Sequence, residues 1–195
     1  FNTMTMPEYL EARYDSYHIK MIATELIFIF LLPYSPSVFK GLECGEKNVE
    51  NVTIILEDGR EIRLELYPDV APLTVKNFLM LVDAKHYDGV VFHRVIEGFM
   101  IQTGGYYIED NTLNEKEAPK TIKGEFIKNG VNNPVKHKKG TISMARTNDP
   151  NSASSQFFLC SVDTPHLDGH YAAFGKASDE ESIKVIEDIS RVKTG

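Results

Sequence analysis

Short runs of alternating apolar and polar residues constrain the fold of this 195-residue chain more than any other feature. The clearest pair covers residues 52–56 and 62–66, where apolar residues occupy every second position on either side of Asp58 and Gly59. A period of two is that of a strand with one buried face, and glycine supplies the positive φ that a tight turn needs. These residues therefore predict a β-hairpin.

Five further stretches have the composition of short strands, and Asn, Asp, Gly and Ser are common between them. They cover residues 90–96, 99–103, 140–145, 156–161 and 172–175. Only two longer patterns are helical, and no internal repeat is present. Many short strands with two helices favour a β-barrel or a sandwich over a doubly wound sheet.

The first helical pattern consists of Val75, Phe78, Leu79 and Val82, which are spaced as i, i+3, i+4 and i+7. This spacing predicts one apolar face, and Pro72 is tolerated in the first turn of such a helix. The second pattern consists of isoleucines at positions 183, 186 and 189, with acidic residues near its start.

Composition excludes some classes of function. A chain of this length with 42% apolar residues fits a single core. The formal net charge of -7 argues against duplex nucleic acid as the main partner, because phosphate binding needs a clustered positive surface. The lysine-rich residues 116–139 are expected to form a solvated loop. Two cysteines, Cys44 and Cys160, are too few for a disulfide scaffold, which favours a reducing compartment and a cytoplasmic location.

Residues 1–48 are interpreted as a leader or extension, and residues 49–195 as the folded domain. The apolar run at 26–32 is much shorter than the ~20 residues that a membrane-spanning helix needs. A signal peptide with Lys20 as its positive flank, or a lipid on Cys44, stays open as an exported or membrane-anchored alternative within residues 20–44.

Three separated segments carry a recognisable pattern. Residues 91–105 read VFHRVIEGFMIQTGG, residues 155–160 read SQFFLC, and residues 166–175 read HLDGHYAAFG. In order and spacing they resemble the cyclophilin family of peptidyl-prolyl cis-trans isomerases, and the likeness extends over roughly residues 49–189. His166 and Tyr171 resemble bacterial members in particular.

The resemblance implies a mainly β fold, a closed antiparallel eight-stranded barrel with a helix capping each open end. Seven strands are recognisable here, so the last strand of the barrel is expected to be missing from this chain. The implied activity is isomerisation of X-Pro bonds during protein folding, by a monomer that needs no cofactor and no metal. The implied partners are proline-containing peptides and unfolded proteins, not nucleic acid, and not a membrane unless residues 20–44 provide a signal or an anchor.

The chemistry requires neither a nucleophile nor a metal. Rotation about the amide has a barrier of about 18–20 kcal/mol, which falls when the proline nitrogen loses resonance and becomes pyramidal. A guanidinium can donate a hydrogen bond to the lone pair of that nitrogen and is charged at any working pH. Arg94 is the predicted catalytic donor. An ion pair with Glu97 is its alternative role, and His93 is expected to point to the opposite side of the strand.

The resemblance also implies a proline slot with polar groups that hold the peptide. The predicted substrate-binding residues are Phe99, Met100, Gln102, Ala145, Arg146, Gln156, Phe158, His166, Leu167 and Tyr171. Three of them depart from well-known eukaryotic members: His166 replaces a frequent Trp, Tyr171 a His and Arg146 an Asn. The loss of the indole leaves at most weak binding of cyclosporin as the expectation.

The sequence gives less support to other functions. His166, Asp168 and His170 could ligate a metal, although Gly169 disfavours the helix that would bring them together. A serine hydrolase lacks its G-x-S-x-G motif. The serious alternative is a non-catalytic module that binds proline-containing segments on the same fold.

Overall fold

The predicted hairpin forms one edge of a larger sheet. The protein is described by a computed structural model, which covers residues 48–117 and 119–193. The hairpin consists of β1 (Glu50–Ile55) and β2 (Glu61–Leu66), paired in antiparallel register. Gly59 in its turn has φ +84°, and Ile62, Leu64 and Leu66 are buried on its inner face as the alternation predicts.

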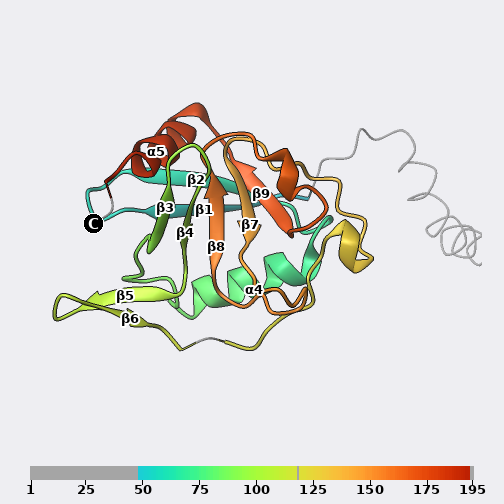
Figure 1. The fold of residues 1–195 in the computed structure, drawn as a ribbon, viewed down its shortest axis with the longest axis horizontal. Helices are drawn as coiled ribbons and strands as arrows, with labels where there is room; N and C mark the ends of the chain where they lie inside the picture. The colour runs from blue at the N-terminus through green and yellow to red at the C-terminus, as the bar shows by residue number, and fades with distance from the viewer. Residues whose placement is uncertain (1–47, 118, 194–195) are drawn as a thin grey trace, which may run out of the picture. The chain divides into compact units, whose positions relative to one another are not determined.

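The other predicted strands complete this sheet, and four of the five are shorter than expected. They are β3 (Arg94–Ile96), β4 (Met100–Thr103), β7 (Thr141–Met144), β8 (Phe157–Cys160) and β9 (Ala173–Ala177). In the described residues the seven-stranded sheet has the order β1-β2-β9-β7-β8-β4-β3 (Figure 1). Val90, the start of the predicted strand 90–96, makes only an isolated bridge to Tyr107.

The register aligns whole rows of residues across neighbouring strands. Val95 lies opposite Ile101, which lies opposite Leu159, which lies opposite Ile142. Ile101, Leu159 and Ile142 are fully buried in the main core, and Val95 packs against it. The adjacent row, one residue along each strand, points to the other face, because successive side chains of a strand alternate.

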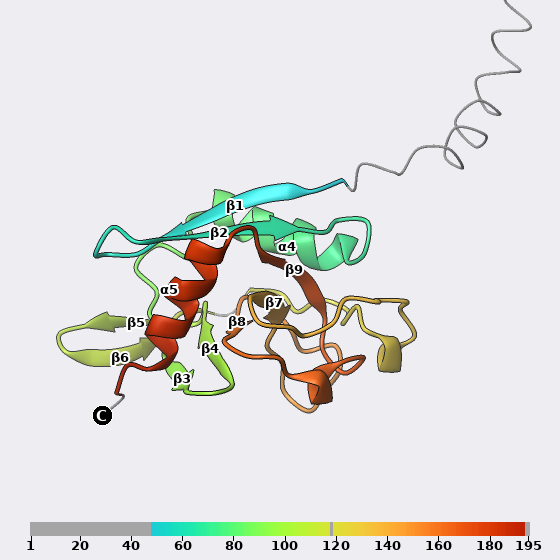
Figure 2. The same cartoon turned by 90° about the horizontal axis from the view of Figure 1, so that it is seen from above.

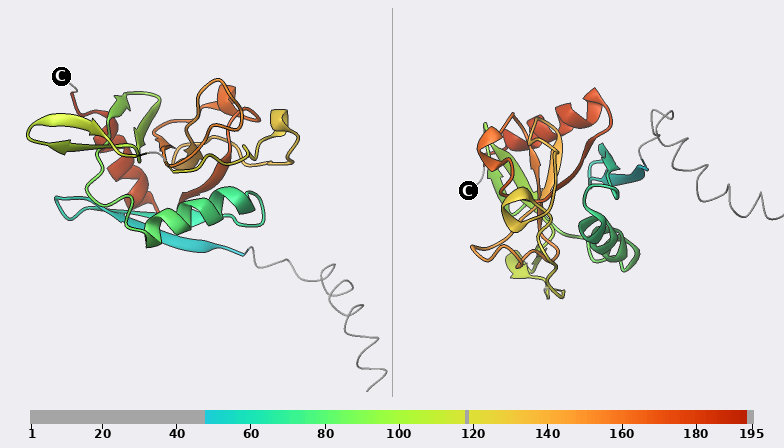
Figure 3. Two further views of the ribbon diagram at one scale, coloured as in Figure 1. Left: turned by 90° about the horizontal axis from the view of Figure 1, so that it is seen from below. Right: turned by 90° about the vertical axis from the view of Figure 1, so that its right-hand side faces the viewer.

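The two predicted helices lie at different borders of the sheet, as Figures 1 and 2 show. Helix α5 (Glu180–Ser190) begins at Asp179, whose carboxylate accepts a 2.7 Å hydrogen bond from the backbone N–H of Ser182. Helix α4 (Pro72–Asp83) begins at Pro72. The views in Figure 3 show α4 beside the β1–β2 ribbon.

The apolar face predicted for α4 is partly wrong. Val75 and Phe78 are buried, but Leu79 is only half-buried and Val82 is 36% exposed. Thr74 and Asn77 are buried instead. Their polar groups are satisfied by residues distant in sequence: the Thr74 hydroxyl donates to Glu125 and the Asn77 amide donates to the carbonyl of Ser154. Partners so far along the chain cannot be inferred from helical periodicity.

A second, two-stranded sheet was not predicted. It consists of β5 (Tyr106–Glu109) and β6 (Thr112–Glu115), and it extends away from the main sheet in Figure 1. Its two-residue turn, Asp110 and Asn111, has φ of 49° and 59°. Asp and Asn tolerate this left-handed conformation, so the pair makes a tight hairpin turn without glycine.

The expectation of a solvated loop at residues 116–139 is also partly wrong. Six of its lysines are exposed and Lys116 is half-buried, but Glu125, Asn133 and His137 are each less than 5% exposed. The Asn133 amide donates to the carbonyls of Glu125 and Ala173. The segment, which includes the 3-10 turn η1 (Ile127–Asn129), therefore anchors itself to the core through polar groups.

The mainly β fold with two helices is confirmed, whereas closure into a barrel is not found in the described part of the chain. There β1 and β3 are the outer strands of the sheet and do not pair with each other. Seven strands leave these two edges apart, and closure would need them to meet or to share another strand.

The expectations for residues 1–47, including the apolar run and Cys44, lie outside the described residues. Within the described ranges, no helix has the length and hydrophobicity to cross a membrane.

Candidate active site

A pocket of about 160 Å³ opens on the outer face of strands β3, β4 and β8. Nine residues line it, and all nine belong to the predicted set: Arg94, Phe99, Met100, Gln102, Ala145, Arg146, Phe158, Leu167 and Tyr171. The two other predicted residues touch this lining from outside. Gln156 accepts a hydrogen bond from the Gln102 amide at 2.9 Å, and the ring of His166 stacks on Phe99 with centroids 5.5 Å apart. The roles assigned to these residues are still predictions.

Sheet register explains why residues so distant in sequence meet here. Arg94 lies opposite Gln102, Gln102 opposite Phe158, and Phe158 opposite Ser143. This row is adjacent to the core row and faces outward. The pocket is therefore fixed by the hydrogen-bonded ladder of four strands, a rigid part of the fold.

Arg94 lies at the polar side of the pocket. Its side chain is exposed and its Nη1 donates to Oε1 of Gln102 at 3.3 Å. No carboxylate lies within ion-pair distance of it in the described ranges, so the alternative pairing with Glu97 is not found. Gln102 bridges Arg94 to Gln156, which makes a polar chain along one wall.

The opposite wall and the floor are apolar and form a cluster separate from the main core. Met100, Phe158 and Leu167 are buried in it, together with Cys160 beneath. Leu167 belongs to the 3-10 turn η2 (Pro165–Leu167), and Tyr171 meets Phe158 edge-on with ring centroids 5.8 Å apart. An aromatic floor with an aliphatic rim suits a ring of the size and polarity of proline.

Arg146 adds a second guanidinium to the lining. It follows β7, and its Nε and Nη2 both donate to the carbonyl of His170, at 3.3 and 2.8 Å. Its Nη1 donates to the carbonyl of Thr147. The guanidinium carbon lies 4.5 Å from the ring centroid of Tyr171 and 5.1 Å from that of Phe126.

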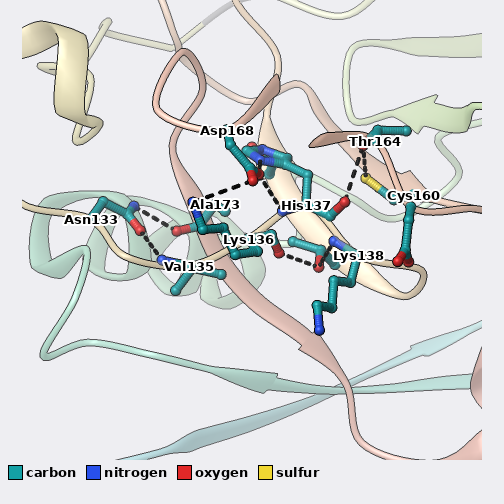
Figure 4. Close-up of polar contacts among 12 residues, drawn as sticks. Asn133, Val135, Lys136, His137, Lys138, Cys160, Thr164, Asp168 and Ala173 are labelled. Atoms are coloured by element: carbon teal, nitrogen blue, oxygen red, sulfur yellow. Dashed lines mark hydrogen bonds and ion pairs between the residues drawn. The ribbon is translucent and has the colours of Figure 1, made fainter. Parts of the chain in front are cut away.

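A buried polar group behind the pocket was missed by the sequence reasoning. Figure 4 shows Asp168 and His137 turned toward each other: Oδ1 of Asp168 accepts from the backbone N–H of His137 at 2.8 Å and lies 3.1 Å from its ring Nδ1. On the other side, Nε2 of His137 lies 3.0 Å from the hydroxyl of Ser143. The imidazole is also stacked against Phe158 at an interplanar angle of 16°.

The environment of His137 keeps its ring neutral. Burial lowers its pKa below the ordinary value, and hydrogen bonding to Asp168 only partly opposes this effect. Partial burial by itself would raise the pKa of Asp168, but the hydrogen bonds from His137 and the nearby Lys136 hold it below its usual value. A neutral imidazole protonated at Nδ1 donates a hydrogen bond to Asp168 and accepts one from the Ser143 hydroxyl at Nε2.

This order of Asp, His and Ser resembles a hydrolase triad, but the site cannot act as one. The side chain of His137 and the whole of Ser143 are fully buried, so no substrate carbonyl can approach the hydroxyl. The sequence gives little indication that His137 is buried and hydrogen-bonded. It lies among lysines, and its partners are Ser143 and the distant Asp168.

The metal alternative also lacks support. Asp168 is committed to His137 and Lys136, and among the described residues no group of three or more His, Cys, Asp or Glu could hold a metal ion. Cys160 is buried beneath the pocket, and burial raises the pKa of its thiol to about 11, so it is not a nucleophile at neutral pH.

Comparison with known proteins assigns the family. Residues 51–195 match the sequence model of the family described as "Cyclophilin type peptidyl-prolyl cis-trans isomerase/CLD". The chain belongs to the cyclophilin family.

Individual peptidyl-prolyl cis-trans isomerases are similar to this chain. A peptidyl-prolyl cis-trans isomerase of Acinetobacter baylyi is 39% identical over 138 residues, which cover 68% of each chain. One of Helicobacter pylori is 42% identical over 130 residues, covering 67% of this chain and 75% of its own. A crystal structure of a Cryptosporidium parvum cyclophilin-type isomerase, determined in the presence of the dipeptide Ala-Pro, has a TM-score of 0.57 and 30% identity, and covers 71% of this chain and 85% of that one.

Proposed function

We propose that this cyclophilin accelerates cis-trans rotation of X-Pro bonds in flexible or unfolded polypeptides, and so assists protein folding. The observation that carries the proposal is the position of Arg94, an exposed cation without a carboxylate partner in the described residues, in the lining of an apolar pocket with Phe99, Met100 and Phe158. The isomerase names of its relatives and the Ala-Pro dipeptide named with the Cryptosporidium structure support this assignment.

The pocket and the cation divide the work between them. The apolar floor holds the proline ring, while Gln102 and Gln156 offer donors and acceptors to the peptide backbone. As the bond twists, the proline nitrogen becomes pyramidal and its lone pair becomes a hydrogen-bond acceptor. Arg94 donates to that lone pair more strongly at the top of the barrier than in either ground state, which lowers the barrier.

Replacing Arg94 with Ala tests this mechanism directly. By analogy with the removal of one transition-state donor elsewhere, we expect kcat for an Ala-Pro peptide to fall by about 10²–10³-fold with little change in peptide affinity. NMR exchange spectroscopy measures the rate and the affinity on the same sample. Arg60→Ala is the matched control, because Arg60 is an exposed arginine in the β1–β2 turn and does not line the pocket.

The same experiment separates the isomerase from a non-catalytic binding module. If the wild-type protein and Arg94→Ala gave equal rates, catalysis by Arg94 would be wrong. Peptide affinity without any acceleration by the wild-type protein would favour the binding module. Cyclosporin is expected to bind weakly at most, because His166 stands in place of an indole. A titration with cyclosporin followed by NMR checks this.

Four broader expectations belong to this proposal. The domain boundary is placed at residues 48/49, the protein is placed in the cytoplasm as a monomer, and the sheet is expected to close into a barrel when an eighth strand pairs beside β1. The small number of cysteines supports the location. Mass spectrometry of the N-terminus from cells tests it, since a cleaved or lipid-bearing segment at residues 20–44 would instead indicate export.

A further inference from the structure

The pocket is positively charged although the chain as a whole is acidic. Two of its nine lining residues, Arg94 and Arg146, carry guanidinium groups, and none carries a carboxylate. The formal net charge of the chain is -7. A concave site lined by one sign of charge attracts groups of the opposite sign and raises their local concentration.

We infer that Arg146 gives this isomerase a preference for substrates that carry a carboxylate on the residue immediately before or after the isomerising proline. The inference rests on the proposed function and specifies its substrate class. Arg94 is reserved for the proline nitrogen in that mechanism. Arg146 carries the second guanidinium of the lining. It is therefore the cation available to a substrate side chain next to the proline.

Arg146 is held in place but its charge is not neutralised. A guanidinium has five N–H donors, and in the described residues Arg146 makes three hydrogen bonds, all to the carbonyl oxygens of His170 and Thr147. The contacts with Tyr171 and Phe126 fix it further. A fixed guanidinium with unused donors is suited to a carboxylate, which it can bind with two parallel hydrogen bonds at little cost in side-chain entropy.

The protein does not supply an internal competitor for this site. Asp168 is the acidic residue next to the lining residue Leu167, and its carboxylate is bound to His137 and Lys136 behind the pocket. None of the ion pairs in the described ranges includes Arg146. A substrate carboxylate would therefore meet an unpaired cation.

A purely structural role for Arg146 would explain its hydrogen bonds to His170 and Thr147, but it makes a different prediction. Loss of a structural arginine would slow all substrates alike. Loss of a specificity-determining cation changes the ratio of rates between acidic and neutral substrates. It leaves the ratio between two neutral substrates unchanged.

The test compares peptides that differ only in charge. One set carries Glu, Gln or Lys immediately before the proline, and a second set carries the same residues immediately after it. NMR exchange spectroscopy gives kcat/KM for each peptide. For the wild-type protein we expect kcat/KM for Glu to exceed that for Gln by about three- to tenfold in at least one set, with Lys the slowest, and a smaller ratio at high salt.

In Arg146→Gln we expect the Glu/Gln ratio to fall to about one, and in Arg146→Lys to take an intermediate value, because lysine keeps the charge but loses the fork. Lys76→Gln is the control for net charge, since Lys76 is exposed on α4 and does not line the pocket. It should keep the wild-type ratio.

Two results would overturn the inference: no preference for Glu over Gln in the wild-type protein, or the same preference in Arg146→Gln. Uniform slowing of all peptides in Arg146→Gln, with the ratio unchanged, would assign Arg146 a structural role only. If the wild-type protein isomerised none of the peptides, the proposed function itself would fail. The affinities from the same spectra would then decide whether Arg146 selects acidic peptides for binding.

Discussion

The inner and outer faces of strands β3, β4, β8 and β7 share one backbone ladder but carry side chains of different chemistry. The inner row, Val95, Ile101, Leu159 and Ile142, is aliphatic, and its last three members are fully buried. The outer row is Arg94, Gln102, Phe158 and Ser143, which mixes a cation, an amide, an aromatic ring and a hydroxyl. One face therefore stabilises the fold, and the other uses the resulting rigidity to hold a site.

This difference explains how a small pocket can hold its side chains at fixed positions. A shift of one residue in register would move the aliphatic row out of the core, which is strongly unfavourable. The core thus fixes the register, and the register fixes the spacing of Arg94, Gln102 and Phe158. Substitutions on the inner face should consequently affect stability with little effect on activity, whereas those on the outer face should also affect activity.

The largest effect on stability is expected for Leu159→Ala on the inner face. Leu159 is fully buried in the main core, and its truncation should lower the free energy of unfolding by about 2–5 kcal/mol. The kcat/KM of the molecules that remain folded should change little. Urea unfolding gives the stability, and NMR exchange at low temperature gives the activity. A large loss of specific activity with unchanged stability would contradict the conclusion that the inner face stabilises the fold.

The neighbouring substitution Phe158→Ala should reduce activity as well as stability, because Phe158 is buried and also lines the pocket. Phe158 forms the pocket floor and belongs to the smaller cluster with Met100 and Leu167. Losing about 1.5–3 kcal/mol of apolar contact with the proline ring corresponds to a reduction in kcat/KM of roughly 10–100-fold. Both affinity and kcat should fall, in contrast to Arg94→Ala. Equal effects of the two variants on kcat with no difference in affinity would contradict this division of roles.

A polar substitution on the core side should affect stability alone, and by less than Leu159→Ala. The Glu125 carboxylate accepts from the backbone N–H of Leu73 at 3.1 Å and of Thr74 at 2.8 Å, so it caps the start of α4. Glu125→Gln keeps the shape but loses the charge at the helix N-terminus, which should cost about 1–2 kcal/mol. Thermal unfolding measures the loss. A change in peptide affinity without a change in melting temperature would disprove it.

The smallest effect is expected from His137, which lies behind the outer row. Because burial lowers the pKa of its ring in the folded protein, unfolding favours proton uptake. The stability that the neutral ring contributes is therefore fully present above the unfolded pKa of about 6.5 and is lost as the pH falls through 6.5 toward the lower folded pKa.

Urea midpoints measured from pH 7.5 to pH 5.5 check this dependence. The wild-type protein should become less stable over that interval, and His137→Asn should show a flatter profile. Asp168 does not interfere. The pKa of its carboxyl is lowered in the folded protein, so the stability that it contributes is lost only below about pH 4. A wild-type profile identical to that of the variant would show that His137 does not titrate on unfolding.

Much of this organisation could be predicted from the sequence, for identifiable reasons. Alternation revealed β1 and β2, and helical spacing revealed α4 and α5. The family pattern brought together residues that occupy one pocket, from Arg94 in β3 to Tyr171 beyond η2. These features depend on local periodicity or on motifs that are contiguous in the chain.

Two of the features that were missed depend on contacts between distant segments. Glu125 caps a helix that begins more than fifty residues earlier, and His137 meets Asp168 across 31 residues. The β5–β6 hairpin was missed because its turn uses Asp110 and Asn111 in place of glycine. Polar residues in a lysine-rich stretch give no sequence signal of burial, since the same composition is typical of solvated loops.

Substitution of the two adjacent glycines after β4 should have different consequences. A methyl group on Gly104, which has φ +96°, would meet the backbone carbonyl oxygen of Ser155 at 2.6 Å, and that atom cannot move without disturbing β8. A methyl group on Gly105 would first meet the side chain of Gln156, whose Nε2 would lie 2.5 Å away. Mutation of the first position would thus be selected against as a folding defect. Mutation of the second would leave a well-folded protein whose Gln156 is pushed away from Gln102, a loss that only an assay with peptide would reveal.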